Sequence, residues 1–469
     1  MVYRLLDVVE SLDIRPISHA IHAKDARGTR PYNPRMMLAL LLYSYMTGIY
    51  SSRQIAAATY ERIDFRALTG DQHPYHTVVN EFRLRHLDAL PQLFVQVLSL
   101  CDRAGLLKLE HVSLDGSKVH ANASKHKAMS HGRMEREVER LEKEIQELLS
   151  QAEAVDQEED ELYGEGRQAH PIEEELKRRE KRLEVIRKAK AELEEEARQA
   201  KAEDLRERAG VQRKAAETES NPTERKRKLT RASRSEEKAD RLTGGKDDEA
   251  GRDGPDDPDD DLPSHRVPST KDGAPTDKAQ RNFTDPDSRI MKRGGEYLQG
   301  YNCQIVVDEL NQIILAEGVT NQAPDQEHLV PMMRRVMSNT GRAPTVLTAD
   351  TGYMSSDNTT YCEGAGIDAY IAVGRDEHGK DPNSDEGPRN DEHEAWSMMR
   401  AKLATERGKE LYSRRKVIVE PVFGHIKEPR GFRRFSLRGV FKVRHEWTLV
   451  CLCNNLLKLL TPQPDFAEA

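Results

Sequence analysis

The chain has 469 residues, of which 36% are hydrophobic and 33% are charged, and its mean hydropathy is −0.78. A chain of this length can hold two to four domains, but this composition supports buried cores along only part of it. Lys and Arg number 73 against 81 Asp and Glu, so the net charge of −8, taken over the whole chain, argues against a nucleic-acid binder.

The apolar stretches exclude a membrane protein. The longest, 36–46 and 448–460, are shorter than the ~20 residues of a spanning helix. Asp7, Glu10 and Asp13 leave no uncharged signal core. The five cysteines form no Cys-x-x-Cys pair, which excludes a zinc knuckle and gives no disulfide framework. We therefore expect a cytoplasmic protein.

Residues 1–110 are predicted to form a helical domain. Asn33 is a good N-cap and Pro34 suits the first position of a helix with a wide apolar face. Ser51 and Gln54 form a capping-box pattern that opens a second helix.

A third helix is predicted from about His76 to beyond Arg85. Its inward positions are Val78, Phe82 and Leu87, and its outward positions are Arg83, Arg85 and His86. Three short helices with a basic third helix are typical of a helix-turn-helix DNA reader. The alternative is a small helical bundle with an ordinary charged surface.

Residues 129–210 are predicted to form a coiled-coil hairpin. Apolar residues recur at alternating spacings of four and three, which is a heptad pattern: Met134, Val138, Leu141, Ile145, Leu148 and Ala152. A similar series begins at Ile172, after a break that contains Gly and Pro. The hairpin could pair with another copy of the chain, and a solvated spacer is the alternative.

Residues 211–280 lose the apolar period. They are basic at 225–231 and strongly acidic at 247–261. Such charge blocks bury too little apolar surface to offset chain entropy, so we expect disorder over 211–280.

Strand patterns return at about residue 297. Segments 298–307 and 312–319 predict a β-hairpin, followed by a helix over 326–338. Further short strands are predicted at 345–349 and 369–373. Together with 111–115 they give about five strands in an α/β sheet. One domain, made of 111–128 and 281–460, is therefore interrupted by the charged segment, and 461–469 is expected to be a flexible tail.

Two strands are predicted to end in aspartates. Asp115 follows a strand with alternating apolar residues, and Asp350 follows the strand at 345–349. Each aspartate has a glycine one or two residues later. Carboxylates at strand ends in α/β sheets occupy the usual position of binding sites. Taken singly, either pattern also fits an ordinary turn.

A third carboxylate, Glu420, lies in the predicted helix 412–427. Lys416 precedes it by one turn and Lys427 follows it by two, so the three share a face. This pattern fits a surface ion-pair ladder or a metal ligand beside phosphate-binding charges. Pro421 is awkward in a surface helix and favours the second interpretation.

These residues resemble those of bacterial insertion-sequence transposases of the DDE type, which have a ribonuclease-H-like core. The matching elements are Asp115, Asp350-Thr-Gly-Tyr353 and Glu420-x6-Lys427, with the blocks 282–289 and 430–439. The family signature places three residues between its Arg and Glu, whereas four separate Arg415 from Glu420 here, so the roles of Tyr412 and Arg415 are open. The resemblance covers about 30–128 and 281–460.

The resemblance implies a catalytic set of Asp115, Asp350 and Glu420 that holds two Mg²⁺ or Mn²⁺ ions. It implies cleavage at the ends of an insertion sequence and strand transfer of the freed 3′-hydroxyl into target DNA. Lys427 would contact a phosphate. The alternatives are a ribonuclease-H-like nuclease that does not join, or an inactive DNA-binding or coiled-coil protein.

The segment 411–445 is predicted to bind the DNA backbone, because it contains ten Lys or Arg against two Glu, interleaved with Phe. The candidate contacts are Tyr412, Arg415, Lys416, Lys427, Arg430, Arg433, Arg434 and Arg438. At least two of the Phe residues are expected in the core. The expected partners are double-stranded DNA and further copies of the chain, as a homodimer or larger assembly at the nucleoid.

The net charge divides along the chain. Residues 129–280 hold 32 basic and 42 acidic residues, a balance of −10, and the remainder has a balance of +2. The acidity that argued against nucleic acid therefore belongs to the inserted segment, and we expect a neutral catalytic domain with a basic face.

Overall fold

The computed structural model describes the chain except for residues 23–30, 164–170, 245–261, 375–389 and 462–469. The acidic block and almost all of the expected tail lie outside the described residues. None of the described helices is long and apolar enough to cross a membrane. The chain forms two compact units, one of 1–122, 259–264 and 290–469, and one of 123–258 and 265–289.

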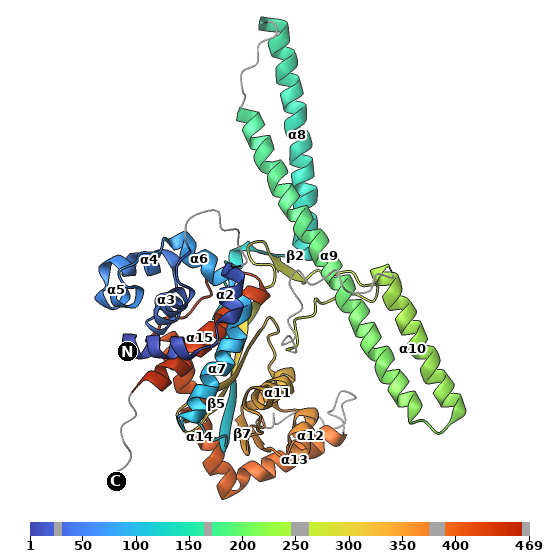
Figure 1. The fold of residues 1–469 in the computed structure, drawn as a ribbon. Helices are drawn as coiled ribbons and strands as arrows, with labels where there is room; N and C mark the ends of the chain where they lie inside the picture. Colours follow the sequence, from blue (N-terminus) through green and yellow to red (C-terminus); the bar gives the residue numbers. More distant parts are fainter. Residues whose placement is uncertain (23–30, 164–170, 245–261, 375–389, 462–469) are drawn as a thin grey trace. The chain divides into compact units, whose positions relative to one another are not determined.

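A six-stranded mixed sheet lies at the centre of the first unit (Figure 1). Its strands follow the order β4-β5-β1-β7-β8, and β6 also pairs with β5. Strand β1 is antiparallel to β5 and parallel to β7, which is parallel to β8. The bounds are β1 His111–His120, β4 Arg289–Arg293, β5 Glu296–Asp308, β6 Ile314–Thr320, β7 Val346–Ala349 and β8 Asp368–Ile371.

Strand β1 is longer than the predicted strand, which was expected to end at Asp115. It continues to His120 because the antiparallel partner β5 continues to pair with it, up to His120 opposite Gly300. Its pairing with the shorter β7 ends at Leu114. Asp115 therefore lies inside β1, at the point where the parallel pairing stops.

Eight helices of the described residues are associated with this sheet and the regions beside it. They are α7 Leu90–Arg103, η4 Gln326–His328, α11 Leu329–Thr340, η5 Thr351–Tyr353, α12 Ser356–Gly364, α13 Asn390–Ala404, α14 Glu406–Lys427 and α15 Val440–Leu460. Every residue of 445–456 in α15 is buried, and the helix packs against β6, α7 and α3. A helix segment that is buried on all sides lies in the interior of a domain.

The remaining helices of the first unit precede β1. They are α1 Val2–Ser11, α2 Arg15–His22, α3 Pro34–Met46, α4 Ser52–Glu61, α5 Ile63–Thr69, α6 His76–Arg85 and η1 Leu87–Ala89. The Asn33 side chain caps α3 by accepting from the Arg35 amide at 2.8 Å, as its position predicts. Ser51 makes no such bond, so the capping box of the second helix is not formed.

The outward basic face predicted for α6 is largely wrong. The Arg83 side chain is buried and donates to the Tyr45 hydroxyl at 3.0 Å and the Tyr50 carbonyl at 3.1 Å. His86 is also buried. The Tyr45 hydroxyl in turn donates to Glu446 of α15 at 3.1 Å. The N-terminal helices therefore pack as part of one unit with the sheet, because polar groups of α3, α6 and α15 satisfy one another.

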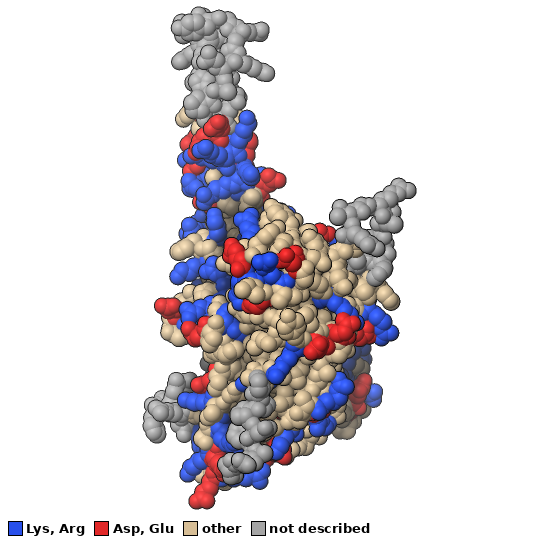
Figure 2. Space-filling model, turned by 60° about the vertical axis from the view of Figure 1, so that its left-hand side comes forward, with Lys and Arg blue, Asp and Glu red and all other residues tan. Residues whose placement is uncertain are grey.

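The second unit contains the predicted helical hairpin, formed by α8 His131–Tyr163 and α9 Pro171–Glu217. Met134, Leu141 and Ile145 pack with Leu183, Ile186 and Leu193 in a shared core. The hairpin helices are also joined by ion pairs: Arg179–Glu144 at 2.7 Å, Arg182–Glu137 at 2.8 Å, Arg187–Glu142 at 2.5 Å and Lys190–Glu135 at 3.2 Å. Figure 2 shows basic and acidic side chains mixed along this hairpin.

The prediction of disorder over 211–280 is wrong for its described part. Helix α9 continues to Glu217, and α10 spans Pro222–Thr243. Strand β3 Gln280–Asn282 pairs with β2 Ala128–Ser130, after η2 Lys125–Lys127. The helices pack through small residues, with Ala202, Ala209, Ala232 and Ala239 fully buried. A prediction of disorder that counts only large apolar residues does not detect a helix interface made of alanines.

Asn455 joins α15 to the edge strand β6. Its side chain accepts from the Ile314 amide at 2.9 Å and donates to the Ile314 carbonyl at 2.8 Å, and all of these groups are buried. Asn455→Leu leaves two backbone groups without partners, so we expect the free energy of unfolding in urea to fall by about 2 to 4 kcal/mol.

Asn454→Leu is the matched control. This neighbour is equally buried, but its side-chain nitrogen finds no hydrogen-bond partner among the described residues. We expect a much smaller loss of stability, and equal losses for the two variants would contradict the role of Asn455.

Candidate active site

The pairing of β1 with β7 places Asp115 and Asp350 next to each other. The last parallel pair is Leu114 with Ala349, so both aspartates are the next residue on neighbouring strands. Their carboxylates interact electrostatically, and both side chains are partly buried. The structure thus brings together two of the three predicted carboxylates.

A short turn fixes the orientation of Asp350. Its carboxylate accepts from the Gly352 amide at 2.8 Å and caps η5, Thr351–Tyr353. The Tyr353 ring is fully buried, and its hydroxyl donates to the Gln304 side chain on β5. The Asp-x-Gly-Tyr sequence is therefore a turn anchored to the sheet by its tyrosine.

Burial raises the pKa of Asp115 to about 6, and the charge of Asp350 adds to this effect, while the Arg415 guanidinium opposes it. Arg415 lies 3.2 Å from the Asp115 carboxylate, and its own side chain is 10% exposed. Burial also raises the pKa of Asp350. Two partly desolvated carboxylates therefore share a region that a cation would stabilise.

Helix α14 carries the third carboxylate and continues through Pro421. Pro421 has no amide hydrogen, so the Val417 carbonyl one turn earlier lacks its helical donor. The Gln312 side chain donates to that carbonyl at 3.0 Å. The helix therefore stays intact after Glu420, with the freed carbonyl bonded from outside it.

Glu420 is exposed on α14, and Arg415 is an electrostatic neighbour. No three acidic, His or Cys side chains of the described residues lie close enough together to hold one metal ion. Glu420 is thus more exposed than the two aspartates, and all three carboxylates are electrostatic neighbours of Arg415. Lys427, on the same face of the helix, reaches β1 and donates to the Ser117 hydroxyl, two residues after Asp115.

The predicted DNA-binding residues fall into two groups. Arg430 is buried and donates to the Tyr45 carbonyl at 3.3 Å and the Val450 carbonyl at 3.0 Å. Arg430 is therefore a structural residue, and its predicted DNA contact is wrong. Tyr412 and Arg415 are partly or fully buried beside the aspartates.

The other group is exposed, and comprises Lys416, Arg433 and Arg434, with Arg438 at the neighbouring loop. Arg433 pairs with Glu428, and Arg438 donates to the Asn122 carbonyl at 3.0 Å. Phe423, Phe432 and Phe435 are buried, which confirms that at least two of the aromatic residues belong to the core.

A fourth carboxylate, Asp325, was missed by the sequence analysis. It lies before η4 and forms an ion pair with Lys118 of β1 at 3.0 Å. It also accepts from the side chains of Asn302 at 2.7 Å and Gln304 at 2.8 Å. It interacts electrostatically with both Asp115 and Asp350. Asp325 lies at no predicted strand end and in no recognised motif. The polar residues Asn302 and Gln304, two positions apart on β5, were the only sequence feature that could have indicated a polar partner.

Gly116 permits this network. A Cβ atom on Gly116 would lie 2.5 Å from the Gln304 side-chain nitrogen and 3.0 Å from an Asp325 carboxylate oxygen. The glycine after Asp115 is therefore needed for close approach inside a strand, and not for the turn at a strand end that the sequence suggested.

Comparison with known families gives the class of this protein. Residues 264–456 match the family described as a transposase DDE domain, and residues 1–85 match a second family, described as a transposase domain (DUF772). The chain belongs to the DDE-type transposases. Searches of curated proteins and of solved structures gave no match.

Membership fixes the class of protein. The catalytic domain of this transposase has the ribonuclease-H-like fold, with the mixed sheet and flanking helices described above. The transposase has DNA as its substrate and is a nucleotidyl-transfer enzyme of a family that uses divalent metal ions.

The raised pKa of Asp115 predicts a pH-dependent stability. Between about pH 4 and pH 6 the folded protein retains a proton that the unfolded chain has lost, so stability falls as the pH rises through this window. The loss attributable to Asp115 is about 3 kcal/mol. Asp115→Asn cannot titrate, so its unfolding free energy should rise relative to that of the wild type from pH 4 to pH 7 in EDTA.

Urea unfolding of both proteins across this range measures the difference, in which the other titrating groups cancel. If the unfolding free energies of the two proteins changed in parallel with pH, Asp115 would not be desolvated in the folded protein.

Proposed function

We propose that this transposase cuts DNA at the ends of an insertion sequence and joins the freed 3′ ends to target DNA, with Asp115, Asp350 and Glu420 as its catalytic residues. The observation that carries this proposal is the placement of Asp115 and Asp350 at the end of the β1–β7 pairing. Cleavage and joining can share one site, because water and a 3′-hydroxyl are both oxygen nucleophiles.

The residues suit a hard divalent cation. Carboxylate oxygens are the ligands that Mg²⁺ and Mn²⁺ prefer, and the two partly buried aspartates raise each other's energy when both are ionised. Asp115 and Asp350 would hold the metal, with Glu420 as the third ligand. Two bound ions would activate the attacking oxygen and stabilise the leaving oxygen.

Cationic side chains near the carboxylates have distinct roles in this proposal. Arg415 contacts Asp115 and balances its charge before DNA binds. Lys427 brings an ammonium group to the same strand, where it would neutralise a phosphate beside the scissile bond. Lys416 and Arg434 are exposed and would contact the DNA backbone further away.

The proposal includes the assembly and its location. An insertion sequence has two ends, so their joint processing needs at least a homodimer on double-stranded DNA. The nucleoid would then be the place of action.

Asp325 is proposed as a positioning residue. Its contacts join Lys118 of β1 to Asn302 and Gln304 of β5, and Gln304 binds the Tyr353 hydroxyl of the turn that follows Asp350. The network therefore fixes the Asp350 turn relative to the strand that carries Asp115. Its carboxylate is engaged by Lys118 and is not offered as a metal ligand.

Substitution of each of the three carboxylates tests the proposed catalytic set. Asp115→Ala, Asp350→Ala and Glu420→Ala should each abolish Mg²⁺-dependent strand cleavage of a labelled element end, because each removes an oxygen ligand, and should leave binding of that end nearly intact. Glu410→Ala, at an exposed position of the same helix α14, is the control for Glu420→Ala.

A variant that still cuts would remove its residue from the ligand set. Strand-transfer products from a precleaved end test joining separately, and cleavage without joining would limit the protein to a nuclease.

Asp325→Asn keeps the size of the side chain and removes its charge. Lys118 then loses its counter-ion at a site where both side chains are under 20% exposed. We expect the cleavage rate to fall about 10- to 100-fold, with a higher Mg²⁺ concentration needed for the half-maximal rate. Glu327→Gln, an exposed acid two residues away, is the matched control. An unchanged Mg²⁺ requirement in Asp325→Asn would contradict the positioning role.

A further inference from the structure

Helix α10 of the second unit carries a row of basic side chains. They occur at spacings of four and three, as Arg227, Arg231, Arg234, Lys238 and Arg241. These spacings place all five on one side of a helix, in a row about 21 Å long at 1.5 Å per residue. We call this row the α10 stripe.

Two of the four acidic residues of α10 form ion pairs with α9. Glu236 pairs with Arg213 at 2.6 Å, and Asp240 pairs with Arg206 at 3.4 Å. Ala232 and Ala239 are buried in the same interface. The packing of α10 on α9 therefore engages two of the four acidic residues of α10, and leaves the positive charge on another side.

The α10 stripe is exposed and mostly lacks counter-ions. Arg231, Arg234 and Arg241 have no ion-pair partner in the described parts of the chain. Arg227 pairs with Glu224 at 3.3 Å, and Lys238 donates to the Lys271 carbonyl at 2.8 Å. The α8–α9 hairpin differs, because arginines along it are matched by glutamates of the facing helix.

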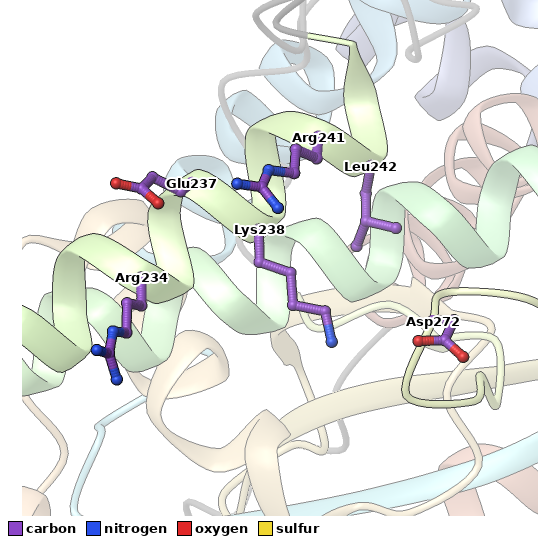
Figure 3. A pocket seen from close by; sticks show the side chains of 6 residues that line it. All are labelled: Arg234, Glu237, Lys238, Arg241, Leu242 and Asp272. Atoms are coloured by element: carbon purple, nitrogen blue, oxygen red, sulfur yellow. The ribbon is translucent and has the colours of Figure 1, made fainter.

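Figure 3 shows Arg234 and Lys238 extending from the same side of α10. Together with Arg241 they border a hollow of about 430 Å³ between the helix and the turn that contains Asp272. Glu237 and Asp272 also border this hollow, so it is not a closed anion site. The positive charge is arranged along the helix, which suits an extended polyanion.

We propose that the α10 stripe binds the phosphate backbone of double-stranded DNA and forms a second DNA contact outside the catalytic domain. The inference rests on the proposed function, since it takes DNA as the partner. A row of 21 Å spans about six base pairs at 3.4 Å each. Arginine guanidinium groups match phosphate oxygens in pairs, and such contacts position a protein on DNA without reading its sequence.

The test uses the full-length protein and a 30-base-pair duplex of arbitrary sequence, with binding followed by fluorescence anisotropy between 50 and 300 mM salt. The stripe variant is Arg231→Gln with Arg234→Gln. The matched control is Arg225→Gln with Lys226→Gln, which removes the same charge from exposed positions of the same helix outside the stripe.

We expect the stripe variant to lower the slope of log K against log salt by about 2 and to weaken binding on the order of 10- to 60-fold at 0.1 M salt. The control should leave the slope nearly unchanged. All four positions are exposed, and circular dichroism checks that the helices remain folded.

Three outcomes overturn the inference. Unchanged binding by the stripe variant excludes the contact, and equal losses in both variants attribute the effect to total charge. Tighter binding by the stripe variant would indicate that the stripe is occupied by the acidic sequence 247–261, with its nine Asp or Glu residues, and not by DNA. Failure of the wild type to bind the duplex at any salt concentration would instead count against the proposed function itself.

Discussion

The parallel pairing of β1 with β7 is the constraint on which the site depends. These strands are separated by more than two hundred residues of sequence, and the whole second unit lies between them in the chain. Their register ends at Leu114 and Ala349, so the next residue on each strand is an aspartate. A shift by one residue would turn one carboxylate to the opposite face of the sheet. Strand β5 extends the constraint, because it pairs with β1 beyond this point and brings Gln304 opposite Gly116.

Helix α15 has a comparable role for the rest of the first unit. Its buried polar groups bind distant segments: Glu446 accepts from Tyr45 and from the amides of Ser436 and Leu437, and Asn455 binds β6. Arg430 bonds to carbonyls of α3 and α15. Buried polar groups are stable only when satisfied, so these contacts fix the helices that carry them. The N-terminal helices and the catalytic sheet consequently share one core.

Electrostatics differ between the two units. At the site, partly buried carboxylates lie together, and burial and the neighbouring charge of Asp350 raise the pKa of Asp115 although Arg415 opposes the rise. Lys118 balances Asp325, and the site favours a cation. In the second unit, charges along α8 and α9 are matched in pairs, whereas the outer side of α10 is not. The net charge of −8 therefore conceals regions of opposite electrostatic character.

The sequence by itself determined the strands, the hairpin helices, the two aspartates and the transposase resemblance, because these follow from local periodicity and short motifs. It did not determine that Arg83 and Arg430 are buried, since burial of a charge depends on partners that are distant in the sequence, 38 residues away for Arg83 and 385 for Arg430. Asp325 and the alanine seam of α10 were missed for the same reason. Only the tertiary structure decided which polar groups form hydrogen bonds and ion pairs with one another. The strength of such an interaction depends on the distance between groups on different strands and helices, and the local sequence does not encode that distance.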